Sequence, residues 1–187
     1  MIHSVRFTCV LDTNVIYPLW IRDLLLWFAY HELYTPKWSN HIFDEWMDVM
    51  LRNNISKSEA IKRTKAIDEA FPDALVKNYE FIINSLDLPD EKDKHVLAAA
   101  IKTNANLIVT NNLKDFPEKY LTGFGLSAKD PDDFFTDIID LNHDVSIKAF
   151  RDLVMIKKNP PYDEFQVLDI FRNNGLRNTA DYLHSLI

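Results

Sequence analysis

The chain has 187 residues, of which 47% are hydrophobic and 26% charged, so it can bury one sizeable core and is not disordered. Its net charge of −7 argues against coating nucleic acid by bulk attraction, but not against an enzyme that acts on nucleic acid through bound cations and a local basic rim. Only three glycines are present, which excludes GxGxxG and Walker-type phosphate loops.

Targeting and redox features point to one compartment. No apolar run reaches the ~18 residues that a membrane helix needs, and the first residues lead directly into a strand pattern, so we expect no signal peptide. Cys9 is the single cysteine, which predicts a buried free thiol and no internal disulfide. These features favour a cytoplasmic protein that does not contact membranes.

The first two thirds of the chain alternate strand and helix patterns. Strands are expected at 5–11, 33–36 (where Pro36 should end the strand), 107–110 and 125–128, and helices at 15–30, 39–53, 56–71, 93–104 and 118–121. Such alternation predicts an α/β fold with a parallel sheet and helices on both faces.

The pattern becomes entirely helical at Asp130-Pro131, a typical helix start. Further helices are expected at 131–140, 144–158, 162–174 and 177–186. No strand pattern or internal repeat appears in this part. We therefore expect a main domain over 1–129 and a small helical extension over 130–187.

Two carboxylates follow strands that are expected to be buried. Asp12 comes directly after the first strand, and Asp115 lies five residues beyond the strand at 107–110. Taken singly, Asp12 could be a helix cap and Asp115 a turn residue. However, ligands of open α/β sheets bind at the carboxyl ends of the strands, which makes both residues candidates for chemistry.

Two more acids lie in the first turns of predicted helices. Glu45 lies at the edge of an apolar stripe, beside Val49. Asp93 lies where the helix dipole favours an anion, so that taken alone it could be a simple helix cap. A parallel layout would bring all four acids to one rim, where like charges repel unless a cation is present. Mg²⁺ or Mn²⁺ suits such oxygen ligands and can activate water for attack on a phosphodiester.

Other polar residues flank these acids. Three neutral side chains could bond a metal-bound water or a phosphate oxygen: Asn14, Thr110 and Asn112. Three lysines could neutralise RNA phosphates at the rim or be ordinary surface residues: Lys92, Lys94 and Lys114. For His95, packing or a hydrogen bond is expected rather than metal ligation, because the site is rich in oxygen ligands.

Four segments together resemble PIN domains, and more narrowly the VapC-type ribonuclease toxins of prokaryotic toxin–antitoxin pairs. They are Leu11-Asp12-Thr13-Asn14, the helix from Ser39 to Glu45 and beyond, Asp90 to Ala100, and Val109 to Phe116. The resemblance covers roughly residues 5–129 in the right order. It implies a PIN-like three-layer α/β/α fold in which four acids hold Mg²⁺ or Mn²⁺: Asp12, Glu45, Asp93 and Asp115.

One position departs from the family pattern. Many members carry an aspartate two residues after the threonine that Thr110 matches, whereas this chain has Asn112 there and its acid at Asp115. Whether Asn112 or Asp115 completes the site is open at this stage. The helical tail resembles an extension found in one larger VapC-like subgroup.

The resemblance implies a metal-dependent endoribonuclease that leaves a 5′-phosphate and a 3′-hydroxyl on structured RNA such as tRNA. It also implies a homodimer and a cognate antitoxin protein that blocks the cleft. One alternative is a haloacid-dehalogenase-like phosphatase with Asp12 as nucleophile, although that class usually has a second carboxylate where Asn14 stands. The other is a non-catalytic PIN-like module that binds RNA or protein, against which the presence of all four acids counts.

Overall fold

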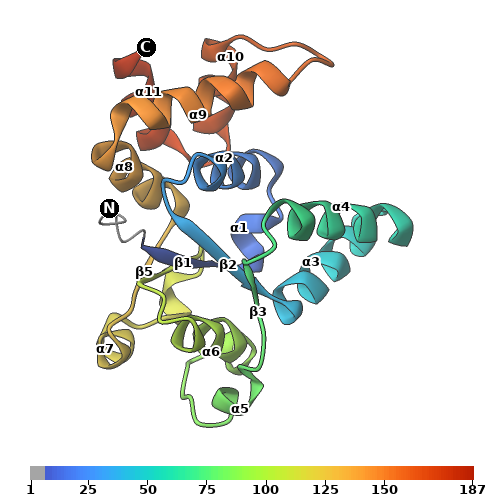
Figure 1. Cartoon of the computed structure of the whole chain (residues 1–187), viewed down its shortest axis with the longest axis vertical. Coiled ribbons are helices and arrows are strands. Elements are labelled where there is room, and N and C mark those ends of the chain that lie inside the picture. The colour runs from blue at the N-terminus through green and yellow to red at the C-terminus, as the bar shows by residue number, and fades with distance from the viewer. Residues whose placement is uncertain (1–6) are drawn as a thin grey trace. The chain divides into compact units, whose positions relative to one another are not determined.

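The structure is a computed structural model that describes residues 7–187, and the chain divides into two compact units (Figure 1). The first, here called the sheet unit, comprises Phe7–Tyr17 and Thr35–Lys129. The second, the helical unit, comprises Pro18–Tyr34 and Asp130–Ile187 among the described residues. The first two residues of the predicted strand at 5–11 lie outside the described residues.

The sheet unit contains five parallel strands in the order β3-β2-β1-β4-β5. They are β1 (Thr8–Leu11), β2 (Thr35–Ser39), β3 (Leu75–Val76), β4 (Leu107–Val109) and β5 (Ser127–Lys129). Consecutive side chains of a strand point to opposite faces, and Cys9 and Val10 of the central strand are both fully buried. Both faces of the sheet are therefore covered at β1, as the predicted α/β class requires, and Cys9 is the buried free thiol expected.

The helices of the sheet unit are α1 (Thr13–Ile16), α3 (Asn40–Arg52), α4 (Lys57–Ala70), α5 (Glu80–Ile83), α6 (Lys94–Lys102) and α7 (Glu118–Leu121). Ser39 caps α3 by accepting a hydrogen bond from the Ile42 amide, and Ser56 caps α4 by accepting one from the Glu59 amide. The Glu59 carboxylate does not complete a capping box with Ser56, because it accepts a hydrogen bond from Arg63 instead. Helix α3 carries the site residue Glu45 and anchors in the core through its apolar stripe.

The single helix predicted at 15–30 is wrong, because the chain forms two helices there. Helix α1 ends at Ile16, and α2 (Leu19–Tyr30) starts after Pro18. Pro18 has an extended backbone (φ −67°, ψ 120°) and no N–H to donate, so it cannot continue the first helix. The break assigns α1 to the sheet unit and α2 to the helical unit.

The predicted end of the second strand at Pro36 is also wrong, since β2 continues through that proline. Amides of a strand point alternately to its two neighbours, and the Trp38 amide donates to the Ala74 carbonyl on the β3 side. Pro36 faces that same side, but β3 begins only opposite Trp38. No ladder hydrogen bond is lost, and the proline is tolerated.

The helical unit consists of α2 together with α8 (Pro131–Leu141), α9 (His143–Ile156), α10 (Glu164–Asn173) and α11 (Arg177–Leu186). The four C-terminal helices agree closely with the prediction, and α2 packs against α9 and α10. Aromatic rings join the helices, as where Phe28 meets Phe135 edge-on at 5.4 Å. The linear division at 129/130 stays a prediction, and none of the helices in 7–187 has the length and hydropathy to cross a membrane.

Asp132 on α8 supplies the missing cap of α11. The residue at the start of α11, Leu176, has no capping side chain, and the Asp132 carboxylate accepts instead from the amides of Asn178 and Thr179 and from the Thr179 hydroxyl. We expect Asp132→Ala to lower the free energy of unfolding by about 2 kcal/mol, measured by urea denaturation. Asp133→Ala, one residue along, should cost less than about 1 kcal/mol, and equal losses would contradict the capping role.

Candidate active site

Three of the four predicted acids line a single cavity of about 450 Å³ in the sheet unit. Asp12 stands at the carboxyl end of β1, Glu45 on α3, and Asp93 in the turn that leads into α6. The remaining lining residues are Thr13, Asn14, Tyr17, Asp48, Val49 and Arg52. Asp115, in the turn after β4, is not part of this lining but is coupled to Asp93 as described below. The structure thus brings three of the four acids together, and the four-acid site stays a prediction.

Asp12 is nearly fully buried, with 4% of its surface exposed. Its Oδ2 accepts hydrogen bonds from Asn14 Nδ2 at 2.6 Å and from the Thr110 hydroxyl at 2.7 Å. Burial raises the pKa of Asp12, although the bond from Thr110 partly offsets this. Asp12 occupies the cap position of α1 but makes no side-chain capping bond, so its conformation is set by the cavity rather than by the helix.

Two of the neutral residues, Asn14 and Thr110, tie the end of β1 to the loop after β4. Asn14 Oδ1 accepts from the Asn111 amide at 2.9 Å, and the Thr110 hydroxyl oxygen accepts from the Asn112 amide at 3.0 Å. The bond from Asn111 to Asn14 and the bond from Thr110 to Asp12 connect two strand ends that lie almost a hundred residues apart in sequence, while the bond from Asn112 to Thr110 lies within the loop. They fix the loop around Asp12. The predicted contact of these neutral side chains with a metal-bound water or a phosphate oxygen stays a prediction.

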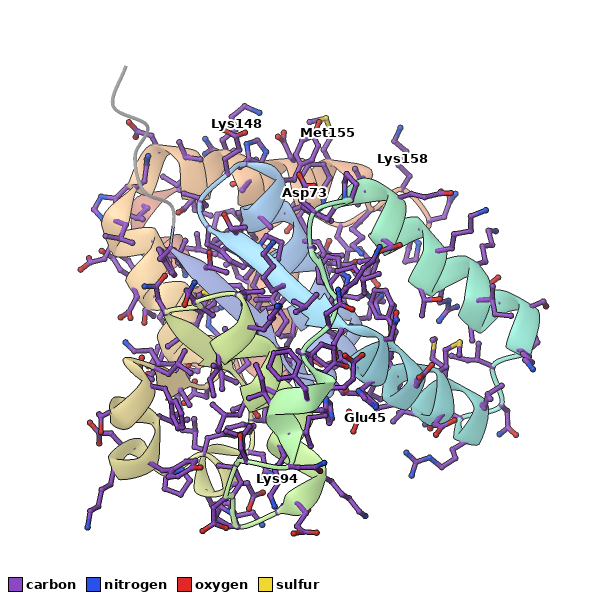
Figure 2. All side chains as sticks on the ribbon, turned by 60° about the horizontal axis from the view of Figure 1, so that its bottom comes forward. Glu45, Asp73, Lys94, Lys148, Met155 and Lys158 are labelled. Atoms are coloured by element: carbon purple, nitrogen blue, oxygen red, sulfur yellow. The ribbon has the colours of Figure 1, made fainter. Side chains whose placement is uncertain are left out.

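Glu45 is held by donors from two other elements. Its Oε2 accepts from the Thr13 hydroxyl at 2.5 Å, and its Oε1 lies 3.0 Å from His95 Nε2. Burial by itself would raise the pKa of Glu45, but the bonds from His95 and Thr13 outweigh it and lower the pKa below 4.5. Figure 2 shows Glu45 on α3. The site therefore contains a carboxylate that stays ionised.

The sequence predicted packing or a hydrogen bond for His95 but gave no indication that Thr13 bonds Glu45. The hydrogen bond of His95 is of the kind expected, although its partner could not be named from sequence. Thr13 received no role, because the contact joins residues 32 apart and no local pattern reports it. Its position directly after Asp12, at the carboxyl end of a strand, was the only available signal.

Asp93 is the most strongly perturbed acid of the cavity. Burial, together with the negative charges of Asp12, Asp90 and Asp115, raises the pKa of Asp93 to about 6. Asn112 Nδ2 lies 3.4 Å from Asp93 Oδ2 and also donates to the Asp115 carboxylate. A neutral amide thus lies between two acids, at the position where many family members would add a further negative charge.

The three lysines predicted as a possible RNA rim do not line the cavity. Lys94 is paired with Glu91 at 3.0 Å, while Lys92 and Lys114 are exposed. Arg52 is the one basic residue among those that line the cavity within the described part of the chain. Sequence reasoning missed Arg52, although its spacing of seven residues from Glu45 places both on one face of α3.

No group of three or more histidine, cysteine, aspartate or glutamate side chains within residues 7–187 is arranged to hold a metal ion. Mg²⁺ does not need such a cage, since in proteins it usually keeps several waters and binds one or two carboxylates. Asp12 and Asp93 share the cavity, and the charge of Asp12 raises the pKa of Asp93. These two residues fit an ion of this kind, because both line the cavity and each lies close enough to feel the charge of the other.

The parallel sheet with its flanking helices agrees with comparisons to known proteins. The PIN domain model matches residues 8–114, more than half of the chain, and the chain belongs to the PIN domain family. A second model, the VapC50 C-terminal domain, matches residues 131–185. A similar protein is "Putative ribonuclease VapC50" of Mycobacterium tuberculosis (strain ATCC 25618 / H37Rv), 40% identical over 78 residues. That match spans 42% of this chain and 46% of the relative, and no solved structure matches.

Proposed function

We propose that this protein is a ribonuclease that hydrolyses RNA phosphodiester bonds with Mg²⁺ or Mn²⁺ held by Asp12 and Asp93. The observation that supports it best is the convergence of Asp12, Glu45 and Asp93 on one cavity, with the pKa of Asp93 raised to about 6. Such crowding of negative charge is unfavourable unless a cation offsets it. Membership of the PIN domain family and the similarity to a protein described as a ribonuclease support the same activity.

The side chains have separable roles in the proposed reaction. The ion, when bound, lowers the pKa of a water molecule and offsets the charge that develops on the phosphate. Glu45 remains an anion and accepts a hydrogen bond from the attacking water. Attack on phosphorus breaks the bond to the 3′-oxygen, which takes up a proton, and leaves a 5′-phosphate and a 3′-hydroxyl. Asn14 and Thr110 keep Asp12 in place.

The fourth position of the site is also part of the proposal. Asn112 bonds both Asp93 and Asp115, so Asp115 acts through Asn112 to orient Asp93. This arrangement holds the turn after β4 against the cavity without adding a full charge at Asn112. Asp115 is then a supporting acid of the metal site.

The partners are proposed from the resemblance to VapC-type toxins, which the match to the VapC50 C-terminal domain supports. They are a structured RNA such as tRNA as substrate, a cognate antitoxin protein that blocks the cavity, and a second copy of the chain in a homodimer. A cytoplasmic location fits these partners.

The test is cleavage of total RNA by the purified protein with Mg²⁺ or Mn²⁺, with and without EDTA. We expect cleavage that EDTA stops and that Asp12→Asn lowers by more than about 100-fold, beyond what loss of an outer-shell partner of a metal site costs. Asp44→Asn, an exposed substitution on α3, is the matched control and should cleave normally. Cleavage that survives EDTA or Asp12→Asn would overturn the proposal.

Two other results would each replace the proposed ribonuclease function with a different one. Release of phosphate from a phosphomonoester through a covalent intermediate on Asp12, without RNA cleavage, would identify a phosphatase. RNA binding without cleavage under any metal would identify a non-catalytic module.

A further inference from the structure

Two residues that line the cavity differ in chemistry from its acids. Besides four carboxylates, the lining includes the cation Arg52 and the aromatic ring of Tyr17. Arg52 is seven residues beyond Glu45 on α3, about 10 Å along the helix at 1.5 Å per residue. Arg52 therefore lines the cavity about two helical turns from Glu45, with the carboxylate of Asp48 between them on α3.

The Arg52 guanidinium is available to a ligand. Its Nε donates to the Asp48 backbone carbonyl at 3.3 Å, and Arg52 makes no ion pair with any residue in 7–187. The side chain is exposed at the last turn of α3. An anchored Nε leaves the two terminal nitrogens free, and Arg binds phosphate through such forked donors.

Tyr17 offers the complementary chemistry. It follows α1, is half-buried, and lines the cavity, and its hydroxyl has no hydrogen-bond partner among the described residues. Aromatic rings that are partly exposed beside a cation are the surfaces on which single-stranded nucleic acid stacks its bases. Helices α1 and α3 pack on each other, so Tyr17 and Arg52 belong to one rigid wall.

If RNA is the substrate, the negative charge of the cavity requires a cationic residue that contacts the RNA backbone. Four carboxylates line the cavity, namely Asp12, Glu45, Asp48 and Asp93, and would repel a polyanion. The metal ion offsets charge only at the scissile phosphate, and none of the lysines at residues 92, 94 and 114 lines the cavity. Among the described residues that line the cavity, Arg52 is therefore the one cation that a neighbouring phosphate can contact.

We propose that Tyr17 and Arg52 form a subsite for the nucleotide that flanks the scissile phosphate in single-stranded RNA. Arg52 pairs with the phosphate of that nucleotide, and the ring of Tyr17 stacks on its base. The subsite sets affinity and places the strand, and it takes no part in bond breaking. This inference rests on the proposed ribonuclease function.

The experiment measures binding of a fluorescent single-stranded RNA oligonucleotide as salt is raised, in the Asp12→Asn background so that the RNA stays intact. We expect Arg52→Gln to reduce the slope of log K against log salt by about 0.7, the contribution of one phosphate contact on a single strand. Arg52→Lys should keep the slope. Arg63→Gln, at an exposed arginine on α4, is the matched control and should leave the slope unchanged.

Tyr17 is tested by a different readout. Tyr17→Leu should weaken binding by about 5-fold or more without changing the salt slope, because stacking contributes about 1–3 kcal/mol per base and a tenfold change corresponds to about 1.4 kcal/mol. Tyr17→Phe keeps the ring and should bind as before. In the cleaving protein, both Arg52→Gln and Tyr17→Leu should raise KM much more than they lower kcat.

The outcomes separate this inference from the proposed function. An unchanged salt slope for Arg52→Gln, or equal losses for Tyr17→Leu and Tyr17→Phe, would overturn the subsite while the wild-type protein still cleaves RNA. Absence of metal-dependent cleavage by the wild-type protein would overturn the proposed function itself. Thermal melts of each variant show whether a loss of binding reflects unfolding, and a folded variant with unchanged binding contradicts the subsite.

Discussion

Asp93→Asn is expected to abolish RNA cleavage and, in the absence of metal, to make the protein more stable. Activity should fall by more than about 100-fold, because the substitution removes one of two carboxylates proposed to hold the ion. Stability should rise because burial, together with repulsion from Asp12, Asp90 and Asp115, disfavours the charged form of Asp93 and raises its pKa to about 6. Removing the charge relieves this repulsion, as is common at sites built for function rather than stability.

The pH dependence of this gain in stability follows from the raised pKa of Asp93. The folded protein binds a proton at Asp93 more tightly than the unfolded chain, whose pKa is near 3.8. Protonation therefore favours the folded state, and this contribution is lost as pH rises from about 4 through about 6. The Tm of metal-free Asp93→Asn should match that of the wild-type protein near pH 4 and exceed it above pH 6.

Screening by solvent limits the gain in stability expected for Asp93→Asn. Asp93 is only half-buried, so screening reduces the repulsion, and we expect a gain of about 1 kcal/mol, or about 2–4 °C in Tm. Mg²⁺ should raise the Tm of the wild-type protein more at pH 7 than at pH 5, and should raise that of Asp93→Asn less. Asp44→Asn is the control for charge removal on an exposed surface. A variant that is less stable than the wild-type protein at pH 7 without metal would contradict the crowding.

Sequence reasoning located the acids because their positions depend on local patterns. An apolar run that ends in a polar residue marks the carboxyl end of a strand, and this placed Asp12 and Asp115. Helix starts placed Glu45 and Asp93, and the parallel sheet then brings strand ends and helix starts to one edge. The fold class followed from the same alternation of strands and helices.

What sequence reasoning did not provide depends on contacts between distant residues. The bond between Thr13 and Glu45, and the hydrogen bond from Asn112 to Asp93, have no local signature. Strand β3 has two residues and α5 has four, too few for a period to be recognised. Pro36 was predicted to end the strand, as proline usually does. The prediction fails because β3 pairs with β2 only from Trp38 onward, so the missing N–H of Pro36 costs no hydrogen bond.

His95 is expected to control the rate through Glu45 without touching RNA or metal. It is buried, its Nε2 lies 3.0 Å from Glu45 Oε1, and its Nδ1 is buried without a hydrogen-bond partner within 7–187. The hydrogen of the ring therefore belongs on Nε2, where it is donated to the carboxylate. The His41 ring lies against His95 at 5.3 Å and bonds the Tyr79 hydroxyl, which limits movement of His95.

We expect His95→Leu to lower kcat by about 10–100-fold with little change in KM, because Glu45 loses one of the two donors that orient it; the size is taken by analogy with the loss of an outer-shell hydrogen bond. His95→Gln should recover most of the rate, because its amide can donate from the place of Nε2. In His95→Leu, Glu45 keeps its burial but loses a donor, so its pKa rises and the acid limb of the pH profile of kcat moves to higher pH. Substitutions of the exposed His184 by Leu and Gln are the controls. Equal activity of His95→Leu and His95→Gln, with an unshifted acid limb, would show that His95 serves packing alone.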